Sequence, residues 1–255
     1  MFGFGKKGKP KVVSLPVSET GKVRKDNQDA FFVDEAKTLF CVADGMGGGS
    51  EGATASRFVC EEVERVAETD GLSERLRAAD AAIAAANGRI FAYAREKGFK
   101  QMGSTVAALF LDPKRSGKAA ICHVGDSRIY RVRRGCAELL TKDHTIGGQL
   151  SEFATGVQAA GLRSRSNPLA HVLTRAIGVE ERVAADWRKL DVREGDAFLV
   201  CSDGVHDVVA DSLVGEILTM SESLGAASKR LSDEIVRNGA PDNYTYVMVK
   251  IGGAE

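Results

Sequence analysis

The sequence predicts an α+β fold: an antiparallel β-sandwich with helices packed on its outer faces, in four layers ordered α/β/β/α. Many short runs of strand-forming residues surround one long pair of helical segments, and this grouping is typical of sheets covered by helices. Several neighbouring strands are joined by turns that are too short for a crossover helix, which parallel neighbours require. A doubly wound parallel sheet is the alternative, and these short turns disfavour it.

Composition limits the classes of function. The 255 residues include 35 basic and 35 acidic side chains, so the net charge of zero gives no electrostatic reason to expect nucleic acid or a membrane as a partner. The five cysteines form no CxxC pair and are expected to be free thiols. There is no signal-peptide apolar region and no membrane-length apolar run, so we expect a cytoplasmic protein, and a monomer. Residues 1–10 are expected to be disordered, and residues 11–255 to form one domain.

The first part of the chain predicts strands and then two helices. Strands are expected at 12–17, 30–33 and 38–43, where apolar and β-branched residues cluster. Residues 50–68 carry valines at helical spacing. From Leu72 to Tyr93, apolar residues recur in alternating steps of four and three, which predicts a helix with one buried face.

The second part returns to strands. Those at 103–112, 120–124, 128–132 and 136–140 are expected to form a meander of antiparallel strands. Residues 141–177 break the pattern with several glycines, Pro168 and a polar run, and we expect an irregular flap insertion there. The remaining predicted elements are strands at 183–192 and 197–201, helices at 212–220 and 223–236, and a final strand opened by Asp242.

Three apolar strands end on an aspartate, and this pattern indicates a metal site. Asp44 and Asp203 each precede a glycine, and Asp126 follows one. A hairpin turn remains the alternative for Asp126, whereas after Asp44 the chain continues as a helix and not as a returning strand. Carboxylates that are brought together repel one another unless a cation lies between them. We therefore expect a hard, oxygen-ligated metal ion at the strand ends.

The other candidates are Arg24, Asp29, Asp242 and the backbone carbonyl of Gly45. A glycine lets its carbonyl approach a bound ion closely, because it has no Cβ. Five aspartates without histidine or cysteine companions favour magnesium or manganese over zinc or copper.

Eight motifs follow one another along most of the chain: VRKDNQDA, VADGMGGG, GSTVAALF, HVGDSRIYRVRRG, LTKDHT, LTRAIG, LVCSDGVHD and PDNYTYVMV. Together they resemble the metal-dependent type 2C (PPM) protein phosphatases, over Gly21 to Ile251, and the DGMGG form is similar to the bacterial members. The resemblance implies a protein serine/threonine phosphatase that hydrolyses phosphoserine and phosphothreonine with a metal-activated water at a Mn²⁺ or Mg²⁺ centre. Phosphorylated proteins would be its substrates, and a cognate serine/threonine kinase would oppose it.

The resemblance also implies which residues hold the ions. The metal ligands would be Asp44, Gly45, Asp203, Asp242, Asp126 and, through water, Asp29. Asp44 would bridge two ions, with the Gly45 carbonyl on the second. Asp203 and Asp242 would complete the first ion, and Asp126 would help to hold a third, weakly bound one. Arg24 would bind the phosphoryl group, so that Arg24, Asp44 and Asp203 are the expected catalytic residues.

Two positions depart from patterns seen in the family. Gln28 stands where the family usually has a glutamate, which removes one negative charge near the second ion and places metal affinity in question. A weakly active or inactive phosphatase-like adaptor that binds phosphoproteins is therefore the alternative function. Met46 stands where some members have a histidine that serves as the leaving-group acid. Metal-bound water is the expected proton donor, with His206 as the alternative.

Overall fold

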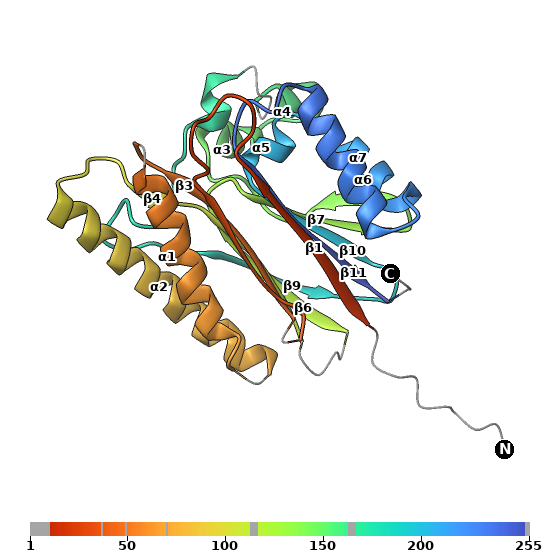
Figure 1. Ribbon diagram of the computed structural model, residues 1–255, viewed down its shortest axis with the longest axis horizontal. Helices are drawn as coiled ribbons and strands as arrows, with labels where there is room; N and C mark the ends of the chain where they lie inside the picture. Colours follow the sequence, from red (N-terminus) through yellow and green to blue (C-terminus); the bar gives the residue numbers. More distant parts are fainter. Residues whose placement is uncertain are drawn as a thin grey trace.

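The structure is a computed structural model that describes residues 11–252 except 37, 49, 70, 113–116 and 163–166 (Figure 1). The predicted disordered segment 1–10 lies outside the described residues. Two antiparallel sheets stack face to face. The first sheet has the order β1 (Val12–Glu19), β11 (Tyr244–Ile251), β10 (Ala197–Cys201), β7 (Arg128–Arg133) and β8 (Cys136–Leu139). The second has the order β2 (Asp29–Asp34), β3 (Leu39–Met46), β5 (Val106–Leu111), β6 (Lys118–Val124) and β9 (Asp186–Asp191), with the short β4 (Gly103–Ser104) paired to β3.

Helices cover both outer faces of the sandwich. The long pair α1 (Ser50–Val66) and α2 (Leu72–Lys97) packs on the second sheet, and α6 (Asp211–Met220) and α7 (Leu224–Arg237) cover the first, with the short α5 (Asp203–His206) at its end (Figure 1). Every strand pairing among the described residues is antiparallel, which confirms the predicted α/β/β/α sandwich over the doubly wound sheet. No helix in the described ranges is both long and apolar enough to cross a membrane.

The central strands are buried on both faces, which explains their continuous apolar sequence. In β5, Val106, Ala108 and Phe110 pack under α1 and α2. The alternate residues Ala107 and Leu109 point into the space between the two sheets. Because side chains alternate along a strand, a strand in this position needs apolar residues at every position.

One predicted connection is wrong. The expected meander pairs the strands on either side of Gly125 and Asp126 with each other, but β6 belongs to the second sheet and β7 to the first. The turn therefore carries the chain across the sandwich. Gly125 has a φ of 95°, and a Cβ there would lie 2.6 Å from Cγ2 of Thr105, so the backbone passes close to the start of β5. The predicted meander is instead two hairpins, β5–β6 and β7–β8, one in each sheet.

The glycine-rich segment 141–177 contains more regular structure than its sequence predicted. It holds the short helices α3 (Ile146–Ser151) and α4 (Gly156–Leu162) and the 3₁₀ turn η1 (Pro168–His171). The hydroxyl of Thr145 caps α3 by accepting a 2.9 Å hydrogen bond from the Gly148 amide. A bridge between Thr145 and Leu173 closes the segment on itself, and another between Ser104 and Ile177 attaches its end to β4.

Candidate metal centre

The two Asp-Gly strand ends meet at one end of the sandwich. Asp44 lies near the end of β3 in the second sheet, and Asp203 begins α5 directly after β10 in the first. Both line a pocket of about 480 Å³. The structure also places Arg24, Gly45, Asp126 and Asp242 around this pocket. The connections between elements thus bring together six of the seven candidate residues from five separate stretches of the chain.

Asp29, the seventh, lies behind the pocket wall. It pairs directly with Asp44 across β2 and β3. Its Oδ2 accepts a 2.7 Å hydrogen bond from the hydroxyl of Ser202, whereas its buried Oδ1 finds no donor within the described part of the chain. Burial is the main cause that raises the pKa of Asp29 to about 6. A buried carboxylate oxygen without a donor is what a cation, or water bound to a cation, would satisfy.

The neighbouring carboxyl groups repel one another. Burial, followed by the charges of Asp29 and Asp203, raises the pKa of Asp44 well above its usual value. Burial and the charge of Asp126 do the same to Asp203, and burial with the charge of Asp143 raises the pKa of Asp126 to about 7. Carboxylates crowded in this way are stable in their charged form when hard divalent cations lie among them, so the donor set fits Mg²⁺ or Mn²⁺.

Arg24 forms an ion pair with one of the candidate ligands. Its Nη2 donates a 2.6 Å hydrogen bond to Oδ2 of Asp242. The Arg24 side chain lines the pocket and is 56% exposed, so a ligand that enters from solvent can reach its guanidinium. A guanidinium at this rim offers several parallel donors to a phosphoryl group.

Gln28 lines the same pocket, beside the start of α1. A Cβ at Gly52 would lie only 2.3 Å from Oε1 of Gln28, and a Cβ at Gly45 would lie 1.9 Å from the carbonyl oxygen of Gly52. The backbone of Gly45, the first turn of α1 and the Gln28 side chain therefore pack in direct contact. Glycine at both positions is required by this close approach.

Two residues near Asp203 were not among the candidates predicted from the sequence. Ligand atoms of His171, Asp203 and Asp207 lie within 4.8 Å of one another, and Nδ1 of His171 is 3.4 Å from Oδ2 of Asp207. Asp207 follows Asp203 by four residues, one helical turn, so the spacing alone could have suggested it. His171 comes from η1, in the glycine-rich segment, and carries no local signal.

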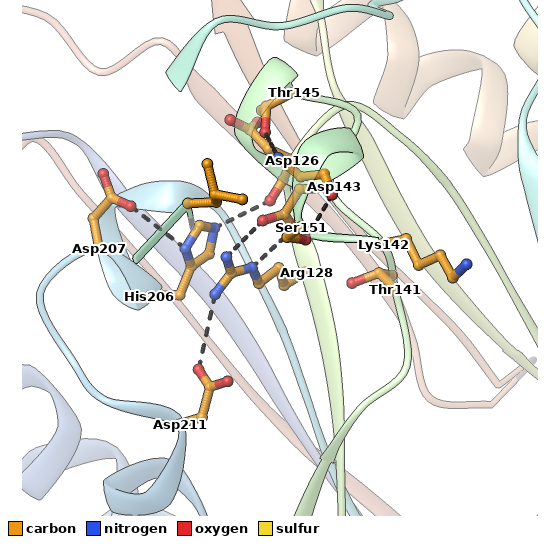
Figure 2. A network of polar contacts seen from close by, with 12 residues as sticks. Asp126, Arg128, Thr141, Lys142, Asp143, Thr145, Ser151, His206, Asp207 and Asp211 are labelled. Carbon is orange, nitrogen blue, oxygen red and sulfur yellow. Dashed lines mark hydrogen bonds and ion pairs between the residues drawn. The ribbon is translucent and has the colours of Figure 1, made fainter. Parts of the chain in front are cut away.

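His206 supports the backbone of the turn that carries Asp126, and it is not among the described residues that line the pocket. It is buried, and its Nε2 donates a 3.1 Å hydrogen bond to the carbonyl oxygen of Asp126 (Figure 2). Burial lowers its pKa to about 3, so it stays neutral at physiological pH. In the same network, Arg128 makes two hydrogen bonds to Asp143, of 2.9 and 2.6 Å (Figure 2). This network joins the Asp126 turn to the base of segment 141–177.

Comparison with known proteins agrees with this geometry. A family model described as protein phosphatase 2C matches residues 20–239. The chain belongs to the protein phosphatase 2C family. It is 32% identical over 235 residues to the serine/threonine protein phosphatase PstP of Mycobacterium tuberculosis, covering 92% of this chain and 44% of that protein's length. It is 29% identical to a putative protein phosphatase 2C-type of Streptococcus pyogenes, covering 91% of this chain and 94% of the relative.

Solved structures of the family share the fold. PppA, described as a key regulatory component of T6SS in Pseudomonas aeruginosa, superposes with a TM-score of 0.84 at 32% identity, covering 94% of this chain and 97% of PppA. The catalytic domain of PstP in complex with two manganese ions superposes with a TM-score of 0.82 at 29% identity, covering 95% and 99%. The family resemblance implied by the eight motifs is thus confirmed.

Proposed function

We propose that this chain is a metal-dependent protein serine/threonine phosphatase and that residues 11–255 form its catalytic domain. The observation that carries the proposal is the meeting of buried carboxylates from both sheets in one pocket, with an exposed arginine at the rim. Family membership and the manganese-bound relative support it. The phosphoprotein-binding adaptor is not favoured, because all seven candidate residues are present and six of them line the pocket.

In this proposal the carboxylates bind the metal ions and Arg24 binds the phosphoryl group. Asp44, Asp203 and Asp242 would hold two Mn²⁺ or Mg²⁺ ions, with the Gly45 carbonyl beside them and Asp29 behind; Asp126 would contribute to a third. Such ions lower the pKa of a water molecule and offset phosphoryl charge. Arg24 breaks its ion pair with Asp242 and binds the phosphoryl oxygens. This contact orients the phosphorus for attack by water. No side chain becomes phosphorylated in this scheme.

We also propose which proteins this chain acts on and that segment 141–177 is a flap beside the pocket. Phosphorylated proteins are the substrates, and a serine/threonine kinase of the same cell supplies them. His171 and Leu173 line the pocket, and both belong to segment 141–177, which supports a flap role for that segment. A monomeric state and a cytoplasmic location remain predictions from the sequence.

Asp203→Asn tests the assignment. Removing a ligand that touches the ion should cost more than the roughly 10- to 100-fold lost when a supporting residue is changed, so we expect a fall in turnover of more than about 100-fold. Turnover is measured on an aryl phosphate with Mn²⁺, and Mn²⁺ binding is measured separately by calorimetry. The control is the thermal melt, which should show a folded variant. Near-normal turnover at saturating Mn²⁺ would refute the assignment.

A further inference from the structure

A second hollow, of about 380 Å³, adjoins the pocket of the candidate metal centre. Met46 and Leu173 line both hollows, so they form the ridge between them. The rest of the second hollow comes from residues 174–184, between η1 and β9. A substrate segment that places its phosphorylated side chain in the first pocket therefore has a direct route across this ridge into the second.

Six of the ten residues that line the second hollow are apolar. Val179 and Val183 line it together with the two ridge residues, and Val179 is 48% exposed, so its side chain is accessible to a ligand. Its charged groups do not favour one sign. Arg175 is held by Asp186 at 2.6 Å, and Arg182 and Glu180 carry opposite charges on the same lining.

The wall of the hollow is built in advance of any ligand. Asn87, buried on α2, accepts a 2.7 Å hydrogen bond from the amide of Gly178. Its Nδ2 donates to the carbonyl oxygens of Glu180 and Glu181, at 2.9 and 3.2 Å. Gly178 itself has a φ of 89°, and a Cβ there would lie 2.1 Å from Cγ2 of Ile90. A wall fixed by these contacts need not be ordered when a ligand binds, which saves conformational entropy.

We propose that the second hollow is a specificity subsite that takes an apolar side chain close to the phosphorylated serine or threonine of the substrate protein. This inference rests on the proposed phosphatase function. Because the hollow continues from the pocket across Met46 and Leu173, we expect its occupant to belong to the same substrate chain. The exposed Val179 and the lack of one dominant charge sign on the lining predict that this occupant is an apolar side chain.

The test uses phosphothreonine peptides in which a single leucine is moved through the positions flanking the phosphothreonine, each paired with the same peptide carrying serine. We expect one position at which leucine raises kcat/KM over serine by about tenfold, the gain that a small apolar pocket provides. Val179→Asp should bring this leucine-to-serine ratio close to one, because it places a carboxylate in the hollow, and Val179→Ala should lower it only in part. A ratio cancels any general change in turnover.

The matched control is Val236→Asp, at a similarly exposed valine near the end of α7, and it should keep the wild-type ratio. Thermal melts verify that each variant is folded. The inference is overturned if wild-type protein shows no leucine preference at any position, or if Val179→Asp keeps it. If Val179→Asp keeps the wild-type leucine-to-serine ratio but changes the sedimentation coefficient of the protein, the hollow is an interface between copies of this chain, and the inference is likewise overturned. Wild-type protein that hydrolyses neither peptides nor aryl phosphate with Mn²⁺ would instead refute the proposed function.

Discussion

At the scale of single residues, Gln28 lines the pocket of the candidate metal centre at a position where the family resemblance leads us to expect a glutamate. Its side chain packs against Gly52 and lines the pocket, so it does not point away into solvent. Its backbone is held as well, because its amide donates a 2.9 Å hydrogen bond to Oδ1 of Asn243 and its carbonyl accepts one of 2.6 Å from Ser56. The side-chain amide of Gln28 therefore lies against the first turn of α1, in the lining of the pocket that the carboxylates share.

Gln28→Glu should lower the concentration of Mn²⁺ needed for half-maximal activity, with little change at saturating metal. The two side chains have nearly the same shape, so the packing against Gly52 is kept while one negative charge is added close to a divalent cation. Activity is titrated against Mn²⁺, and calorimetry gives the Mn²⁺ affinity independently of turnover. Superimposable curves would remove Gln28 from the site, and a higher metal demand would contradict the charge argument.

At the scale of elements, the turn between β6 and β7 determines where Asp126 lies, and His144 of segment 141–177 holds this turn in place. The amide of Gly125 donates a 3.1 Å hydrogen bond to Nδ1 of His144, and the His144 amide donates one of 3.0 Å to the Gly125 carbonyl. The His144 ring stacks on His123 with 4.6 Å between centroids. Burial lowers the pKa of His144 to about 4, so Nδ1 keeps the lone pair that this contact requires.

His144→Asn and His144→Gln distinguish this contact from simple packing. An asparagine oxygen can occupy the place of Nδ1, whereas the longer glutamine places its polar group near the former Nε2. Gln should leave the buried Gly125 amide without an acceptor and should destabilise the protein by about 1–3 kcal/mol more than Asn does. Urea unfolding of metal-free protein measures both free energies. If the two variants were equally stable, the hydrogen bond to Gly125 would have no special role.

At the scale of the whole molecule, the carboxyl cluster couples stability to metal and pH. In the unfolded chain these aspartates titrate near about pH 3.9. In the folded, metal-free protein the pKa is about 6 for Asp29 and about 7 for Asp126, and burial with neighbouring carboxylates also raises the pKa of Asp44 and of Asp203 well above the usual value. Between these values the folded state binds more protons than the unfolded state. Their contribution to the free energy of unfolding therefore falls as pH rises from about 4 through 7.

The gain in melting temperature on adding Mn²⁺ should accordingly be larger at pH 8 than at pH 6, because the ions offset a repulsion that is fully present only at the higher pH. The difference with and without metal is the quantity to measure. His144 and His206, whose pKa values are lowered by burial, impose the opposite slope between about pH 4 and 6.5 whether or not metal is bound. A metal-induced gain that stays constant or shrinks toward pH 8 would show that the cluster does not bind the ions.

The sequence by itself determined the order and type of the main strands and of the four long helices, because periodic apolar residues report which faces of a segment are buried. It also determined that aspartates stand at the ends of apolar strands. It could not determine which sheet receives each strand: Gly125 and Asp126 are as suitable for a hairpin as for the crossing that the structure shows. Burial of a face is a local property, whereas the partner that covers it is not. For the same reason, only the tertiary structure placed His171 beside Asp203, paired Arg24 with Asp242, and formed the hollow next to Val179.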